Sequence, residues 1–312
     1  MLKLIAKRLM LAIPTIFIVA TFSFGLIKMV PGDPAVMILG QTASQADIEK
    51  LHDQLGLNRP VFEQYTTWLG SALHGDLGTS ILTGRPVLQE LAIALPPTIS
   101  LAFLTTLISL VVGLTLGVVA AVKRGVWDGA IQGVSSFGLA IPSFWAAYVL
   151  VLAFALTWRI FPATGYTPIN EDPRAWLLGL TLPAISIAIG NTCQILLQTR
   201  SSVLDILSRD FVRTLQATGV QRSTILAKHV LRNAAIPVAV VTGISFIGVF
   251  SGVVVIEAIF NTPGLGNLLL TGVRSADFPM VQGAILFFAL LVIVVNLAVD
   301  IVTAWLDPRV RV

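Results

Sequence analysis

The sequence offers few side chains in an arrangement that could catalyse a reaction. Its three histidines, His52, His74 and His229, lie far apart, and its single cysteine, Cys193, stands inside an apolar stretch, so no metal site is expected. No lysine is preceded by glycine, which excludes the Gly-x-x-x-x-Gly-Lys-[Ser/Thr] loop that binds nucleotide phosphates. We also find no nucleophile paired with a base. We therefore expect a chain that is not an enzyme and that holds no cofactor.

One acidic residue stands out because of its apolar surroundings. Glu257 directly follows the apolar run Ala234–Ile256. A charge at the centre of a bilayer costs about 2.5–3.5 kcal/mol on insertion scales, so this side chain should face protein or water. It could line a path for a solute or bind a solute's ammonium group. The alternative, which we favour, is a structural hydrogen bond to the backbone of the turn Pro263–Gly266.

The elements that position these residues follow from composition. Of the 312 residues, 55% are hydrophobic and only 12% are charged, with a mean hydropathy of +0.88. Soluble domains carry roughly a quarter of charged residues, so a soluble fold of this size could not cover its surface. The formal net charge is +4, but the basic residues are spread singly between apolar runs, which argues against nucleic-acid binding.

Six apolar segments are long enough to cross a membrane, since a spanning helix needs about 20 residues. They are Leu9–Ile27, Thr98–Val122, Ala130–Trp158, Trp176–Thr199, Ala234–Ile256 and Phe278–Val299. The first is preceded by Lys3, Lys7 and Arg8, as in a secretory signal, but it is long and lacks a cleavage site, so we interpret it as a retained helix. Pro14, Pro142, Pro183 and Pro237 are compatible with spanning helices.

The positions of lysine and arginine predict the orientation of these spans. Most of the 20 basic residues fall before the first span, between spans two and three, between spans four and five, or after the last span. Because such residues accumulate on the cytoplasmic side, both termini are expected to be cytoplasmic. The predicted organisation is an N-terminal transmembrane helix (1–30), an external segment (31–97) and a core of five transmembrane helices (98–312) with a cytoplasmic segment (200–233). In the external segment, Gln45–Leu55 is a predicted helix with Ser44 as its N-cap and Gly56 as its end.

The cytoplasmic segment has the pattern of two short helices. Apolar residues at helical spacing predict an amphipathic helix over Ser201–Thr218, namely Leu204, Leu207, Phe211 and Leu215. Gly219 is placed to end it, and Ser223 to cap a second helix that ends at Arg232. This knuckle would fit a partner's groove; an interfacial helix lying on lipid headgroups is the alternative.

The same segment carries a resemblance to a known family. Asp210–Gly219 (DFVRTLQATG) and Leu231–Pro237 (LRNAAIP) resemble the coupling-loop signature of binding-protein-dependent ABC permeases, in the variant of the oligopeptide/dipeptide/nickel family. Arg213-Thr-Leu stands where the general signature has Glu-Ala-Ala, and His229–Arg232 where it has Ile-x-Leu-Pro. Further similar segments occur in order along the chain: Pro31–Pro34, Leu55–Pro60, Gln64-Tyr65, Gly75–Gly78 with Ser80, Glu257–Gly266, Asp277–Pro279, Gln282-Gly283, Asn296–Asp300 and Leu306–Arg309.

The resemblance implies an all-α membrane protein with the type I ABC importer permease fold, in the bacterial cytoplasmic (inner) membrane and in contact with lipid. Implied partners are a second homologous permease, two ATPase subunits that bind ATP and Mg, and an external solute-binding protein. Implied ATPase-coupling residues are Arg213, Gln216, Ala217, Thr218, Gly219 and Val220. Implied pathway or outer-gate residues are Glu257, Asn261, Pro263, Gly264 and Gly266, with a plain connecting turn as the alternative for the glycines.

The implied function is ATP-driven import of di- or oligopeptides by alternating access, and relatives suggest nickel chelates, glutathione or other small solutes as alternatives. A secondary transporter would call for inverted repeats and several buried ionisable residues, whereas only Glu257 and Asp300 lie in or at the predicted spans and no repeat is found. A membrane scaffold without transport activity is a third possibility.

Overall fold

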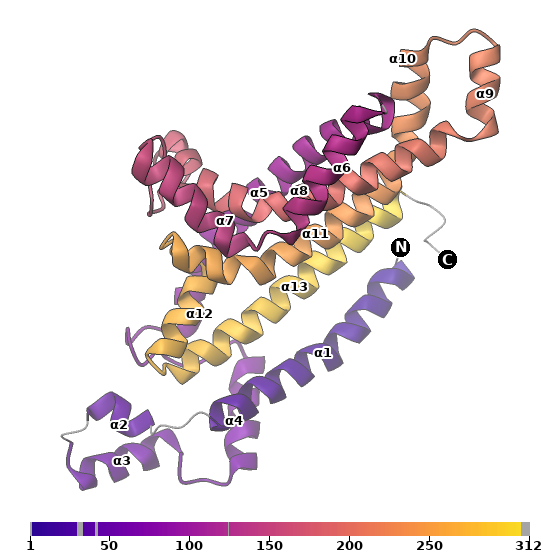
Figure 1. The fold of residues 1–312 in the computed structure, drawn as a ribbon. Helices are drawn as coiled ribbons and strands as arrows, with labels where there is room; N and C mark the ends of the chain where they lie inside the picture. The colour runs from indigo at the N-terminus through magenta and orange to yellow at the C-terminus, as the bar shows by residue number, and fades with distance from the viewer. Residues whose placement is uncertain (1, 30–33, 41–42, 124, 307–312) are drawn as a thin grey trace. The chain divides into compact units, whose positions relative to one another are not determined.

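The fold is known from a computed structural model that describes residues 2–29, 34–40, 43–123 and 125–306 (Figure 1). This part of the chain is helical, and its one β-bridge joins Thr79 and Pro86. The first helices are α1 (Leu2–Met29), α2 (Pro34–Leu39), α3 (Gln45–Leu55), α4 (Val61–Leu73), α5 (Val87–Lys123), α6 (Val126–Ala140) and α7 (Ser143–Leu150), followed by the π-helical η1 (Val151–Thr157). The rest are α8 (Pro173–Leu207), α9 (Asp210–Ala217), α10 (Arg222–Thr224), the π-helical η2 (Ile225–Val230), α11 (Leu231–Ile259), α12 (Leu265–Arg274) and α13 (Phe278–Leu306).

The helices divide between two compact units. The first unit comprises Thr98–Thr262 with Met1–Leu4 and Val295–Val312, and the second comprises Ile5–Pro97 with Pro263–Val294. The predicted coupling segment belongs to the first unit, as does Glu257. The residues after Thr262 that were predicted to form an outer gate belong to the second unit.

Within the described ranges, five helices are long and apolar enough to span a membrane: Ile5–Met29, Val87–Lys123, Pro173–Leu207, Arg222–Ile259 and Phe278–Trp305. Each contains one of the predicted spans, so the predicted all-α membrane fold is confirmed. Pro14, Pro183 and Pro237 lie inside continuous helices.

The third predicted span, Ala130–Trp158, is wrong as a single straight helix. It is a pair of helical segments, Val126–Ala140 and Ser143–Thr157, that meet at a bend of 100°. The break falls at Ile141, whose backbone is extended (ψ 119°), just before Pro142. Proline lacks an N–H and disfavours the helical conformation of the residue before it, so the helix ends here. The described helices give six spans if this pair counts as one.

The second unit confirms the predicted features of residues 44–56. The Ser44 side chain accepts a hydrogen bond from the Asp47 backbone N–H (3.2 Å), and Gly56 ends α3 in the left-handed conformation (φ +66°). A buried carboxylate organises a loop of the same unit: Ser80 donates a 2.5 Å hydrogen bond to Asp277 Oδ2, and the Leu82 N–H donates to the same oxygen (3.2 Å). Residues 31–33 and 307–309 of the family-like segments lie outside the described residues.

The first unit is built around α8, which packs against α5, α6, α7 and α11. Close approach to α5 requires glycine, because a Cβ on Gly113 would lie 2.9 Å from the Ile195 side chain and one on Gly117 would lie 2.6 Å from Thr199 Cβ. Near one end of α8, Arg200 forms a two-pronged ion pair with Asp128 of α6 (Nε–Oδ1 2.5 Å, Nη2–Oδ2 2.7 Å). These contacts fix the register of α8 against its neighbours.

Candidate functional site

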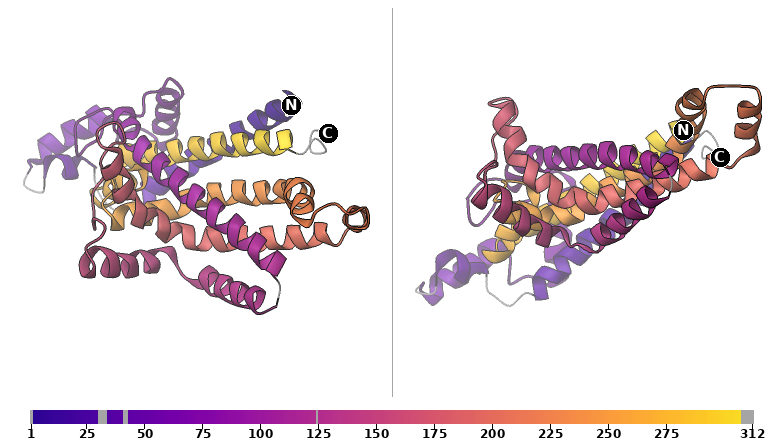
Figure 2. Two further views of the ribbon diagram at one scale, coloured as in Figure 1. Left: turned by 90° about the horizontal axis from the view of Figure 1, so that it is seen from above. Right: turned by 45° about the horizontal axis from the view of Figure 1, so that its top comes forward.

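The predicted coupling segment is a protruding helix and loop at one end of the first unit. Figure 1 shows α9 lying beside α10 at the tip of this end, connected by a short loop, and both views in Figure 2 show the same arrangement. The base of the segment is held by a small apolar cluster: Val212 of α9 is fully buried, as are Ile225 and Val230 of η2, against Val203 and Ala121. α9 is therefore anchored by one face only.

The helix boundaries in this segment differ from the predicted ones. The predicted helix Ser201–Thr218 is interrupted, since α8 continues to Leu207, Ser208 is its C-cap, and a new helix starts at Asp210. The apolar spacing was correct on both sides of the break, but apolar periodicity does not reveal a change of direction. Phe211, which was assigned to the apolar face of this helix, is 40% exposed.

The second helix also begins differently. The N-cap position is taken by Gln221 rather than Ser223, and no side chain caps it. The helix does not stop at Arg232, because α10, η2 and α11 follow one another without a break to Ile259. Helix α9 and the loop that follows it therefore connect the end of α8 to the start of the long helix Arg222–Ile259.

The tip of the loop has the geometry that ends a helix with glycine. Gly219 adopts the left-handed conformation (φ +77°) and donates its N–H to the Gln216 carbonyl (3.1 Å), while the Val220 N–H donates to the Leu215 carbonyl (3.1 Å). The Thr218 hydroxyl donates to the Leu215 carbonyl (3.0 Å). These bonds fold the tip back onto the last turn of α9.

The predicted coupling residues share one property, which is exposure. Arg213, Gln216, Ala217, Thr218 and Gly219 are exposed, and Val220 is half-buried. Arg213 lies 3.7 Å from Asp210, but their side chains are 76% and 98% exposed, so water screens this ion pair. Behind them lies a cavity of about 430 Å³, lined by Gln216, Arg222, Ser223, Leu207 and neighbouring apolar side chains.

Glu257 lies elsewhere in the first unit, near the opposite end of α11. Its side chain is completely buried, and Thr98 donates a 2.6 Å hydrogen bond from Oγ1 to Glu257 Oε1. The predicted structural partner of Glu257 was the adjacent turn, whereas the hydrogen bond comes from Thr98, 159 positions away. The helix ends at Phe260, and Asn261 is exposed with a left-handed backbone (φ +49°).

Comparison with known proteins explains this architecture. Residues 113–312 match the family described as binding-protein-dependent transport system inner membrane component, and residues 1–102 match the N-terminal region of such membrane components. The chain belongs to this family. It is 42% identical to a Brucella abortus (strain 2308) protein that is named a peptide transport system permease. The match covers 100% of this chain and 99% of that protein. It is 35% identical to the glutathione transport system permease protein GsiC of Escherichia coli (strain K12), with the same coverage.

Membership places the permease among the multi-pass proteins of the inner membrane, in agreement with its long apolar helices. It is a subunit of an ABC transport system and not itself an enzyme, as its sequence predicts. The family also implies that a solute-binding protein and ATPase subunits act with it. The predicted recognition of the family is confirmed.

The remaining predicted gate residues lie in the second unit of the permease. Pro263 is exposed and Gly264 is buried at the N-cap position of α12, where its carbonyl accepts from the Leu268 N–H (3.0 Å). Gly266 was expected in the turn Pro263–Gly266, either as part of an outer gate or as part of a plain connection. It lies instead in the first turn of α12 and is buried, so the turn ends two residues earlier than predicted.

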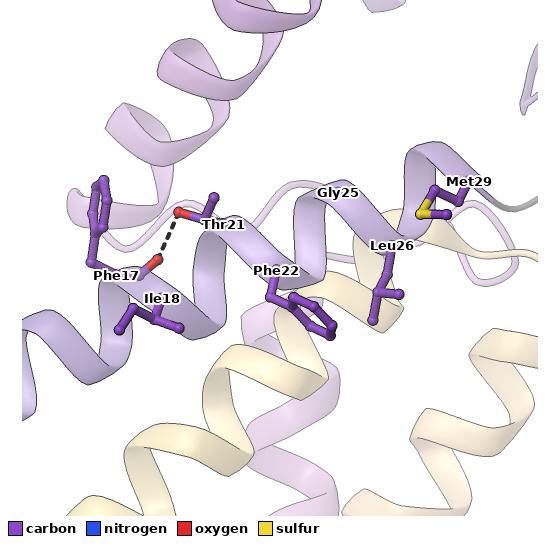
Figure 3. A pocket seen from close by; sticks show the side chains of 7 residues that line it. All are labelled: Phe17, Ile18, Thr21, Phe22, Gly25, Leu26 and Met29. Carbon is purple, nitrogen blue, oxygen red and sulfur yellow. Dashed lines mark hydrogen bonds between the residues drawn. The ribbon is translucent and has the colours of Figure 1, made fainter.

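A shallow groove of about 490 Å³ runs along α1 of the permease and is lined by Phe17, Ile18, Thr21, Phe22, Gly25, Leu26 and Met29 (Figure 3). Its one polar side chain, Thr21, donates to the Phe17 carbonyl (2.8 Å). All of its lining residues come from a single apolar helix, which is the surface expected to face lipid chains. This groove therefore offers no group that would bind a polar solute.

Proposed function

We propose that the permease carries short peptides across the inner membrane, driven by ATP that two separate ATPase subunits hydrolyse. The observation that carries the proposal is the likeness over the whole chain to a relative named for peptide transport, together with an exposed, self-supported loop at Gly219. A second, homologous permease would complete the path, and an external solute-binding protein would deliver the peptide. ATP and Mg would be bound by the ATPases, so the permease needs no cofactor.

In this proposal, α9 and the loop at Gly219 dock into a groove of an ATPase subunit. The exposure of Arg213, Gln216 and Thr218 supports this role, because side chains that face outward on a rigid tip are available to a partner. The exposed Phe211 adds an apolar anchor on the same helix. Closure of the ATPase pair on ATP would then push the loop and reorient the helices by rigid-body motion, which is alternating access.

The proposed pathway and gate residues are Glu257, Asn261, Pro263, Gly264 and Gly266. The burial of Glu257 supports a mainly structural role for its carboxylate in the described conformation. Asn261 and Pro263 are exposed beside the end of α11, which supports a role in contact with solute or binding protein.

The test is purification from the native membrane in mild detergent, followed by transport in proteoliposomes. A second permease and ATPase chains should co-purify, and the reconstituted complex with its binding protein should accumulate labelled di- and tripeptides only when ATP is supplied. Isolation as a lone chain or homodimer without ATPase would refute the proposal and favour a secondary carrier.

Glutathione is the second candidate substrate, favoured by the 35% identity to the glutathione permease. Competition separates the two candidates. Unlabelled glutathione should displace a labelled peptide only if the system accepts both. Uptake of glutathione without uptake of any peptide would overturn the peptide assignment while leaving the ATP-driven mechanism intact.

A further inference from the structure

One face of α8 carries a row of polar side chains through an otherwise apolar spanning helix. The residues are Asn191, Gln194, Gln198, Ser201 and Asp205. They follow one another at spacings of three, four, three and four, which places them on one side of a helix. The remaining faces of α8 in this region are covered by α5, α6 and α11, and Cys193, Ile195 and Leu196 are buried there.

The row reaches the middle of the membrane-spanning region. The Gln194 carboxamide oxygen accepts a 3.2 Å hydrogen bond from Ser245 Oγ of α11. Ser245 is the central residue of α11, which runs from Leu231 to Ile259, and so it lies about 20 Å from either helix end at 1.5 Å per residue. The Gln194 amide therefore lies far from both membrane surfaces. Binding to lipid headgroups cannot explain a polar side chain at this depth.

This polar face is not closed off by the part of the chain that the structure describes. Gln194 is exposed, and Asn191 and Gln198 are half-buried. The Asn191 Nδ2 atom itself is buried and has no hydrogen-bond partner among the described residues. Gly190 lies one turn before Gln194 on α8 and Gly248 one turn after Ser245 on α11, and a Cβ on either would meet no atom of the described residues within 4 Å. The space in front of Gln194 is therefore open in the described part of the chain.

Polar groups in contact with hydrocarbon are strongly unfavourable, because lipid offers no hydrogen bonds to replace those made with water. Exposed amides at the middle of a span therefore face protein or a water-filled cavity. We propose that Asn191, Gln194 and Gln198 line the aqueous path through which the solute passes. The identity of the solute rests on the proposed function; the presence of the path does not.

The chemistry of the row fits a peptide. A carboxamide both donates and accepts hydrogen bonds, as a peptide backbone unit does, so a ladder of neutral amides can exchange hydrogen bonds with successive backbone groups. The three side chains carry no charge, so none of them would trap a charged terminus or side chain by an ion pair. Such a surface suits passage of peptides of varied sequence.

Cysteine accessibility tests the path directly, and the chain has only Cys193 to remove. In a Cys193→Ala background, we would prepare Asn191→Cys, Gln194→Cys and Gln198→Cys, and assemble each with its partner subunits. The matched controls are Leu107→Cys and Val111→Cys on α5, which are exposed apolar positions near the depth at which Gly113 meets Ile195. A negatively charged, membrane-impermeant thiosulfonate reagent is applied in the nucleotide-free and ATP-bound states.

The polar row should be labelled at least about tenfold faster than the α5 controls in one of the two states, because only water carries the charged reagent. Labelling of all three positions at the control rate in both states would overturn the inference. Because labelling requires no transport, a labelled row without peptide uptake would refute the peptide substrate alone, and peptide uptake with an unlabelled row would refute the path alone.

The amide chemistry has a separate test at one position. In the reconstituted transporter, Gln194→Leu should lower peptide uptake about tenfold, because leucine has a similar size but no hydrogen-bonding group. Gln194→Asn should retain most of the uptake. Equal uptake by the leucine variant would show that the solute does not bind this amide.

Discussion

Thr98 at the unit boundary within α5 donates a 2.6 Å hydrogen bond to Glu257 near the end of α11, and neither side chain has any exposed surface. The bond joins two spanning helices that are far apart in the sequence. Buried carboxylates are costly unless they accept hydrogen bonds, so Thr98 offsets part of the cost of placing Glu257 there. Thr98→Val should lower the free energy of unfolding by about 1–3 kcal/mol, since one bond to a buried acceptor is lost.

The measurement is the midpoint of thermal or denaturant unfolding of the purified permease in detergent. Thr98→Ser keeps the hydroxyl group and should remain within about 1 kcal/mol of the native protein. If the valine and serine variants are equally stable, the hydrogen bond does not stabilise this part of the fold.

The ion pair between Arg200 and Asp128 should contribute more than an exposed pair. Its side chains are 22% and 18% exposed, and both prongs are close. Asp128→Ala should lower the free energy of unfolding by roughly 2 kcal/mol, a value between those for surface pairs and fully buried pairs. The reason is that the Arg200 guanidinium stays partly buried but loses this partner. The measurement is the free energy of unfolding in detergent.

The exposed pair Arg209–Asp205, with side chains 61% and 65% exposed, is the matched control. Asp205→Ala should change stability by no more than about 0.5 kcal/mol. Similar losses for both alanine variants would contradict the argument from burial.

Gly219 gives a test of coupling that separates strain from docking. A Cβ at this position meets no atom of the described residues within 4 Å, so a larger side chain costs only the strain of a left-handed residue, roughly 1–2 kcal/mol. Gly219→Trp should leave the permease folded in the membrane and abolish ATP-driven uptake, because under the proposed docking the bulky tip would no longer fit the ATPase groove.

The matched control is Gly75, which follows the end of α4. It has a similar backbone φ (+84°), the same pair of helix-ending hydrogen bonds (Gly75 N–H to Ala72 and Asp76 N–H to Ser71, both 3.0 Å), and no atom of the described residues within 4 Å of an added Cβ. Gly75→Trp should carry comparable strain and still transport. Uptake and co-purification of the ATPase are the two readouts, and full activity of the Gly219 variant would remove the coupling role from this loop.

Helix packing through Gly117 predicts a contrast between two glycine-to-alanine changes. At Gly117, the new methyl group would lie 2.6 Å from Thr199 Cβ and 2.7 Å from the Leu196 carbonyl oxygen, and a backbone oxygen cannot move aside easily. Gly117→Ala should therefore cost about 1–3 kcal/mol by overpacking.

A methyl group added at Gly133 in α6 would instead meet no atom within 4 Å. Gly133→Ala should stabilise the helix by up to about 1 kcal/mol, because alanine has the higher helix propensity. Unfolding in detergent measures both variants. If Gly133→Ala lowers stability and Gly117→Ala leaves it unchanged, the tightly packed position is not Gly117.

The sequence predicts the spans well because hydrophobicity is summed over many residues, so that local errors average out. It does not predict the bend at Ile141, because proline is tolerated in the helices at Pro14, Pro183 and Pro237, and only the three-dimensional surroundings distinguish Pro142. The break at Ser208 is hidden for a related reason, since α8 and α9 carry apolar residues in the same period.

The candidate sites show a similar division. The exposed loop at Gly219 was predictable, because a glycine after an amphipathic helix is a local signal. The pairs Thr98–Glu257 and Asp128–Arg200 were not, because hydrogen bonds between distant residues leave no periodic trace in a single sequence. The polar row on α8 was visible in the sequence as amides spaced by three and four, but only the bond to Ser245 establishes its depth.

The continuity of Arg222–Ile259 has a mechanical consequence. Helix α9 and the loop at Gly219 together join the end of α8 to the start of a continuous helix 38 residues long, or about 57 Å, and α8 and this helix are joined near their middles by the hydrogen bond from Ser245 to Gln194. Under the proposed coupling, a push on the loop would travel along both helices, because helices resist bending. The described helix departs from regular α-helical hydrogen bonding at the π-helical η2 and at Pro237, which lacks an N–H, so these are its least rigid sections. Under the proposed coupling, their stiffness would set how much of the motion of the loop reaches the middle of the membrane.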